Sequence, residues 1–142
     1  MKKFNGTTKF ERWQEKYHHC LALEFSNPKY FKVHHLLVLT YMLQTNGYSD
    51  DYHTMAIHLL KNFLNNSITP QEFKEKYHSF ETNQDNKNRL RNEDIEELEW
   101  NIDITDIRTD NEEQYCKDVV LWANDVLITL ENSGLKNNIR NG

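Results

Sequence analysis

Glycine and proline are scarce in this sequence, with four and two in 142 residues. Tight turns and hairpins depend on these residues, so their scarcity argues against a fold of many short strands. Cysteine is scarce too: Cys20 and Cys116 are the only two and lie far apart in the chain. Two reduced thiols in a cytoplasmic protein fit this spacing better than a disulfide framework, although a single disulfide stays open.

Two classes of partner lack support in the composition. No apolar run is long enough to cross a membrane, and the most apolar segment, residues 33–43, contains two histidines. The net charge is −5, from 17 basic and 22 acidic residues, with no clustered positive surface of the kind that binds phosphate backbones. We therefore expect no membrane and no nucleic acid as partner. The N-terminus carries two lysines without an apolar stretch behind them, which predicts no export signal and a cytoplasmic location.

Helical periodicity predicts an all-α fold, an irregular bundle of about five helices in a single domain over residues 1–142. Helices are expected over residues 8–25, 28–45, 49–65, 69–80 and 111–131. The helix over 28–45 is apolar on nearly every side, so we expect it at the centre of the bundle. Thr69–Glu72 reads Thr-Pro-Gln-Glu, the pattern of a capping box at a helix start.

The stretch over residues 81–110 combines a polar loop with one short extended segment. Leu98, Trp100, Ile102 and Ile104 alternate with polar residues, which is the strand period. No second strand is predicted to pair with them. The segment is therefore either an arm laid across the helices or an edge that pairs with a second copy, which would make a homodimer. The tail over residues 135–142 is polar, and we expect it to be loose.

Four residues are candidates for a metal site between helices: Glu24, His34, His35 and His58. Glu24 continues the inward stripe of the first helix, where an unpaired carboxylate would be costly, so a buried histidine is a sensible partner. Three such groups from three helices resemble a site for a divalent transition metal. The alternative is that these histidines are hydrogen-bonded core residues, with His58 at the border of an exposed face. No catalytic residue is predicted, because none of the diagnostic metal or nucleophile spacings is present.

The segment "LALEFSNPKYFKVHHLLVLTYMLQTNGYS", with "HLL" at His58–Leu60 and "VVLWANDV" at Val119–Val126, resembles the DUF5946 family of uncharacterised bacterial proteins. The resemblance implies a small, mostly helical domain and singles out the double histidine, but it implies no reaction. The positions that carry it are Glu24, Phe25, His34, His35, Leu36, Val38, Thr40, Tyr41, Gln44, Trp122 and Ala123.

This chain departs from the family pattern at two places. Many members resemble "QHPxG" where this chain has "QTNG", so Thr45 and Asn46 stand in place of His and Pro. The N-terminal Cys-x-x-Cys pair that members often carry is missing, and any zinc role of that pair does not transfer. Two hypotheses follow. One is an interaction or structural module, with a homodimer through the extended segment as one form of it. The other is a helical metalloprotein or small-molecule enzyme with a His/Glu site.

Overall fold

The fold is all-α, as the sequence predicts. A computed structural model of the protein describes residues 9–45, 50–83 and 98–133, and it shows no strand in these ranges. Its elements are α1 (Lys9–Ser26), α2 (Pro28–Phe31), α3 (His34–Gln44), α4 (Asp50–Leu64), α5 (Pro70–Asn83), the 3₁₀ helix η3 (Ile104–Asp106) and α7 (Glu112–Ser133). None of the described helices is both long and apolar enough to cross a bilayer.

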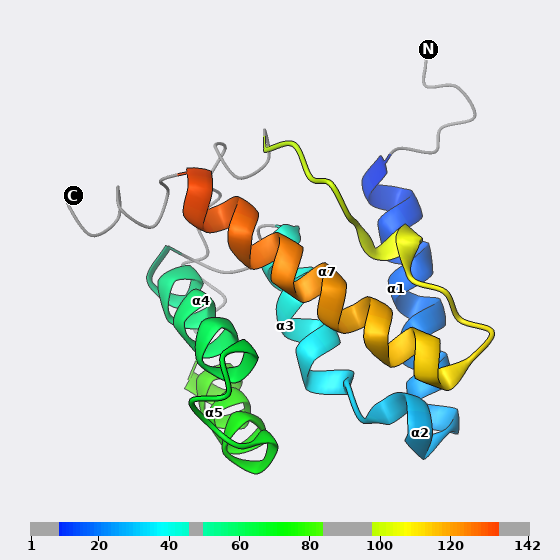
Figure 1. Cartoon of the computed structure of the whole chain (residues 1–142), viewed down its shortest axis with the longest axis horizontal. Coiled ribbons are helices and arrows are strands. Elements are labelled where there is room, and N and C mark those ends of the chain that lie inside the picture. Colours follow the sequence, from blue (N-terminus) through cyan, green and yellow to red (C-terminus); the bar gives the residue numbers. More distant parts are fainter. Residues whose placement is uncertain (1–8, 46–49, 84–97, 134–142) are drawn as a thin grey trace.

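Helix α3 occupies the centre of the bundle, and the prediction of its central position is confirmed. No side chain from Val33 to Thr45 is exposed, and Leu37, Leu39 and Leu43 have no accessible surface. Helix α7 packs along α3, and α4 lies beside both of them (Figure 1). Helix α1 contacts α3 on the side opposite α4. Because neighbours cover α3 on several sides, the apolar residues all around it are buried.

The helix predicted over residues 28–45 is in fact two helices, α2 and α3, separated by a turn at Lys32–Val33. Val33 has φ −107° and ψ 17°, outside the helical region. Polar contacts on the two sides of the turn reach different partners: the Tyr30 hydroxyl donates to the carbonyl of Thr109 at 2.9 Å, whereas His34 contacts α1. Neither glycine nor proline marks this break, so tertiary contacts rather than local sequence determine it.

The predicted capping box at the start of α5 is confirmed. The amide of Glu72 donates to Thr69 Oγ1 at 3.0 Å, and the amide of Thr69 donates to Glu72 Oε1 at 2.8 Å. Helix α5 continues to Asn83, so the polar loop predicted from residue 81 begins later than expected. The rest of that loop and the predictions for residues 46–49 and 135–142 lie outside the described residues.

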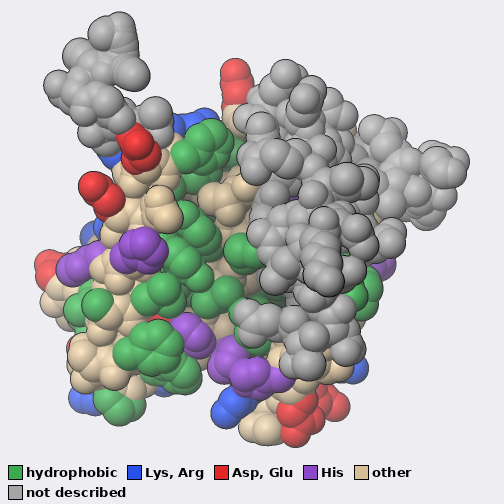
Figure 2. Space-filling view, turned by 180° about the vertical axis from the view of Figure 1, so that it is seen from behind, with side chains coloured by type: hydrophobic (Ala, Val, Ile, Leu, Met, Phe, Trp, Pro, Cys, Tyr) green, Lys and Arg blue, Asp and Glu red, His purple; other side chains and the backbone are tan. Residues whose placement is uncertain are grey.

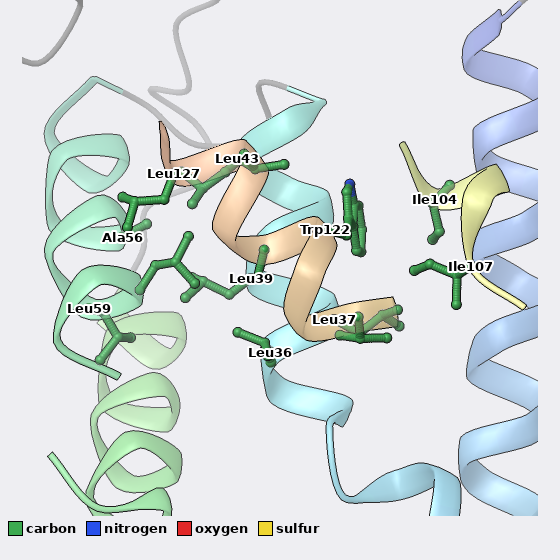
Figure 3. Close-up of a cluster of buried hydrophobic side chains, with 14 of the residues drawn as sticks. Leu36, Leu37, Leu39, Leu43, Ala56, Leu59, Ile104, Ile107, Trp122 and Leu127 are labelled. Atoms are coloured by element: carbon green, nitrogen blue, oxygen red, sulfur yellow. The ribbon is translucent and has the colours of Figure 1, made fainter. Parts of the chain in front are cut away.

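The extended segment is an arm laid across its own chain, which is one of the two alternatives above. Residues 98–107, here called the arm, follow the flank of α1 and α7 (Figure 1). Ile104 and Ile107 are almost fully buried and face Trp122 (Figure 3). Two side chains anchor the arm's backbone: Gln44 Nε2 donates to the carbonyl of Ile102 at 2.8 Å, and Lys16 Nζ donates to the carbonyl of Ile107 at 2.6 Å.

Helical spacing in the sequence predicts inward positions for Phe10, Met55 and Val120, but all three are exposed. On α4 the spacing predicts a buried stripe of Tyr52, Met55, Ala56, Leu59 and Phe63. The observed stripe is rotated from it and consists of His53, Ala56, Ile57, Leu59 and Leu60. Helix α4 packs against α3, α5 and α7 at once, and this arrangement selects the buried face. On α7 the helical spacing predicts one buried stripe: Tyr115, Val119, Trp122, Val126 and Leu130. This prediction is confirmed, because none of the five has exposed surface.

Candidate functional site

Glu24 is the centre of a buried polar network that joins three helices. Its side chain on α1 has no exposed surface. Oε1 contacts Nδ1 of His34 on α3 at 2.8 Å, and Oε2 accepts a hydrogen bond from the Tyr115 hydroxyl on α7 at 2.5 Å. A carboxylate oxygen only accepts, so Nδ1 of His34 carries the proton. The expected pairing of Glu24 with a buried histidine is thus found.

His34 lies between aromatic rings. Its ring stacks on Phe31 with 4.6 Å between centroids and lies 5.1 Å from the ring of Phe25. Its side chain is 15% exposed. Since Nδ1 is bound by fully buried Glu24, the exposed part of the ring is its outer edge, which carries Nε2. This arrangement fixes both the tautomer and the orientation of the imidazole.

His35 lies beside His34, with 5.1 Å between the ring centroids, and its other side faces α5. Its ring is 5.1 Å from that of Tyr77 and 5.1 Å from that of His78, both on α5. Burial, together with the neighbouring His34, His78 and Lys74, lowers the pKa of His35 to about 4. His35 is therefore neutral at pH 7.

His58 does not join the other candidates. It is exposed on α4, where it lines a shallow depression with Met55, Leu59 and Lys76. Helices α3 and α7 lie between α4 and α1 (Figure 1). The exposed position agrees with the reading of His58 as a residue at the border of a solvent-facing surface.

Of the four candidates, Glu24 pairs with His34, His35 lies beside His34 but faces α5, and His58 lies apart on α4. Within the described ranges no group of three or more His, Cys, Asp or Glu side chains is arranged to hold a metal ion. Both oxygens of Glu24 already accept hydrogen bonds. Glu24 therefore orients the imidazole of His34 and has no oxygen left without a hydrogen bond. Metal binding by these residues stays a prediction.

Tyr115 and Cys20 belong to the network but were not predicted as site residues. Burial and the hydrogen bond to Glu24 raise the pKa of Tyr115. Cys20 is hydrogen-bonded to Tyr115, and burial raises the pKa of the Cys20 thiol to about 11. Tyr115 is 91 residues from Glu24 in the chain, so no local spacing connects them. Both thiols are free, and neither Cys20 nor Cys116 forms a disulfide.

His53 is a second buried histidine that sequence reasoning missed. It is 1% exposed, and neither ring nitrogen has a hydrogen-bond partner among the residues that the structure describes. Burial lowers its pKa to about 4. The signal was present in the sequence, because His53 begins the i, i+3, i+4, i+7 stripe that continues through Ala56, Ile57 and Leu60.

Gln44 forms a second buried link between elements distant in the chain. Its Oε1 accepts from the indole Nε1 of Trp122 at 3.0 Å, while its Nε2 holds the arm at Ile102. Gln44 is 2% exposed, so both ends of its amide are satisfied inside the protein. The polar positions Glu24, His34 and Gln44 thus join α1, α3, α7 and the arm.

Comparison with known proteins gives a family and no function. The model of a family of unknown function, DUF5946, matches residues 13–131. No curated protein and no solved structure matches the chain. The matched range contains the Glu24–His34–Tyr115 network, the Gln44 link and the whole of α3. The chain is therefore a member of the DUF5946 family of unknown function.

Proposed function

We propose that this protein is an interaction module that pairs with a second copy of itself through the outer face of α7. One observation carries the proposal: Leu121 and Ile128 are 58% and 54% exposed and lie seven residues apart on one face of α7. Apolar side chains of this size at such spacing are typical of a helix that packs against another helix. The two free thiols suit a reducing compartment, which supports the bacterial cytoplasm as its location.

The face is complementary to itself, which favours a second copy over another partner. In an antiparallel pair of α7 helices centred near Asn124, Leu121 of one copy would lie against Ile128 of the other. By the same symmetry, Lys117 of one copy would lie near Asn132 of the other, so the two Lys117 side chains would stay apart. A two-fold pair uses the same surface on both subunits, and this surface satisfies that condition. The apolar area is small, so we expect a weak dimer that dissociates on dilution.

The arm is a less suitable dimer surface than α7. Trp100 is half-buried against the core of its own chain, and Ile104 and Ile107 of the arm are buried in that core. Pairing through the arm would expose these side chains and break the hydrogen bonds from Lys16 and Gln44.

Light scattering across a concentration series tests the dimer. Leu121→Lys should abolish association while leaving the urea unfolding curve unchanged, because the side chain is exposed in the monomer. Met55→Lys is the matched control, since Met55 is 51% exposed on α4, away from this face. A wild-type protein that stays monomeric at every concentration, or a dimer that Leu121→Lys leaves intact, would refute the proposal.

A second candidate, a metal or small-molecule site at His34, is favoured by the Glu24 carboxylate behind its ring. Carboxylates hold metal-binding histidines in this way, and a site of this kind would use Nε2 of His34. One imidazole is too few for a transition metal, so further ligands would come from a second copy or from a small molecule.

Bound metal measured on protein purified without chelators tests this second candidate. If His34 binds a metal, the protein should contain stoichiometric zinc or another divalent transition metal, and His34→Ala should lose it. His19→Ala, which removes an exposed histidine on α1, is the control and should retain the metal. Metal-free protein that binds no added zinc or cobalt would exclude a metal role for His34.

A further inference from the structure

A depression of about 300 Å³ lies where the α2–α3 turn meets α5 and the end of α4. Its apolar surface comes from Phe31, Leu36, Phe63 and Phe73, with Val120 of α7 at one side. The rings of Phe63 and Phe73 stack with 4.3 Å between their centroids, so they form one aromatic wall. Figure 2 shows histidine and apolar side chains together on the back face of the molecule.

The charged and polar groups that line the depression are Lys32, Lys74, His35 and Gln71, and no carboxylate lines it among the residues that the structure describes. This is unusual for a chain with a net charge of −5. Neither lysine forms an ion pair within the described part of the chain. Excess positive charge beside an apolar wall, with low-dielectric protein behind it, attracts anions more strongly than the same charge on an open surface.

The nearest acidic residues of α5 are engaged elsewhere. Glu72 accepts from the amide of Thr69 in the capping box, and Glu75 accepts from Gln71 Nε2 at 3.1 Å. Neither Glu72 nor Glu75 lines the depression. The two lysines are therefore left to interact with an external anion.

His35 adds a neutral polar group to the same wall. Because its imidazole is uncharged at pH 7, it offers one N–H donor and one acceptor. The depression therefore combines two cations, one neutral imidazole and an apolar surface at the small end of the size range of ligand pockets.

We propose that this depression binds a small organic molecule that carries a carboxylate on a short aliphatic or aromatic body. The carboxylate would lie between Lys32 and Lys74 and accept from His35, while the apolar body would cover Phe31 and Phe73. A larger or strictly polar anion does not fit as well, because the apolar wall would then be covered by polar groups without partners. The site does not require the α7 dimer.

Amide chemical shifts of labelled full-length protein test the site with two matched pairs of probes, hexanoate with hexanamide and phenylacetate with phenylacetamide. At least one acid should produce saturable shifts at residues of the depression, such as Val33 and Lys74. The corresponding amide should bind about tenfold more weakly, since it lacks the charge that the lysines recognise.

Charge reversal at Lys74 distinguishes specific binding in the depression from attraction of the anion by the overall surface charge. Lys74→Glu should weaken binding of the acid by at least about tenfold, whereas Lys76→Glu, an exposed change on the same helix outside the depression, should leave it within about twofold. Three results would each overturn the proposal: no saturable shift with either acid, equal binding of acid and amide, or equal weakening by both substitutions.

Discussion

The Glu24 carboxylate has no exposed surface, and the fold can bury it because each of its oxygens accepts a hydrogen bond. His34 on α3 and Tyr115 on α7 supply the two hydrogen bonds. A buried carboxylate that loses a donor is destabilised by more than the bond itself contributes, because desolvation is no longer compensated. The network therefore makes the packing of α1, α3 and α7 interdependent.

Tyr115→Phe should destabilise the protein by about 2–3 kcal/mol, since it leaves Oε2 of buried Glu24 without a donor. Tyr30→Phe is the control: its hydroxyl also donates one hydrogen bond, but to the half-buried carbonyl of Thr109, so we expect a cost of only about 1 kcal/mol. Urea unfolding at pH 7 measures both values. Equal costs for the two substitutions would show that the Glu24 carboxylate does not depend on Tyr115.

At the level of elements, the arm is held by contacts that come from far away in the chain. The amide of Gln44 on α3 connects the carbonyl of Ile102 with the indole of Trp122. Buried Ile104 and Ile107 add apolar contacts. The arm is thus part of the core, although it forms no strand and only one turn of 3₁₀ helix.

Gln44→Glu should release the arm selectively. A carboxylate keeps the acceptor for Trp122 Nε1 but places a second acceptor opposite the carbonyl of Ile102, which costs about 2 kcal/mol. Hydrogen–deuterium exchange should therefore become faster in residues 98–107 while α4 and α5 keep their protection. Gln14→Glu, at an exposed position of α1, is the control and should change neither region. Unchanged exchange in the arm would contradict the role given to Gln44.

Elements with local signals could be predicted from the sequence. The capping box at Thr69–Glu72 and the stripe of α7 contain their own evidence within a few residues, and both are confirmed. Glu24 could be predicted to need a partner because it lies on an apolar stripe. The turn at Lys32–Val33 and the hydrogen bond from Tyr115 could not, since each depends on contacts made only after distant segments pack.

At the scale of the whole molecule, two histidines link folding to pH. Burial lowers the pKa of His53 and of His35 to about 4 in the folded protein, against 6.5 for an unperturbed histidine. Between these values the unfolded chain binds protons that the folded protein does not, so stability falls as the pH is lowered from about 6.5 to 4.

Asp118 acts at lower pH, because its hydrogen bonds from Arg108 lower its pKa to about 2. The stability it contributes is lost only below about pH 4.

His53→Leu should flatten this pH dependence. The wild-type protein is expected to lose up to about 3 kcal/mol from His53 between pH 7 and pH 4, since each unit of pKa shift corresponds to about 1.4 kcal/mol. The leucine variant has no histidine at this position to protonate, so it should not lose this stability. At pH 7 it should be at least as stable as the wild-type protein, because it has no buried ring nitrogen without a partner. Urea unfolding at pH 7, 6 and 5 measures the slope. The same slope in His53→Leu would show that other groups control the acid response.

The two free thiols differ in a way that is useful for labelling. Cys20 is fully buried, whereas Cys116 is only half-buried at the start of α7, next to the carbonyl of Lys29. A thiol reagent should react with Cys116 first, so the natural sequence already provides a single attachment point for a spin label or fluorophore. Cys116 lies about 1.4 turns from Leu121 on the same helix, and both line the same shallow depression. A probe on Cys116 would therefore register the approach of a second molecule without any engineered cysteine.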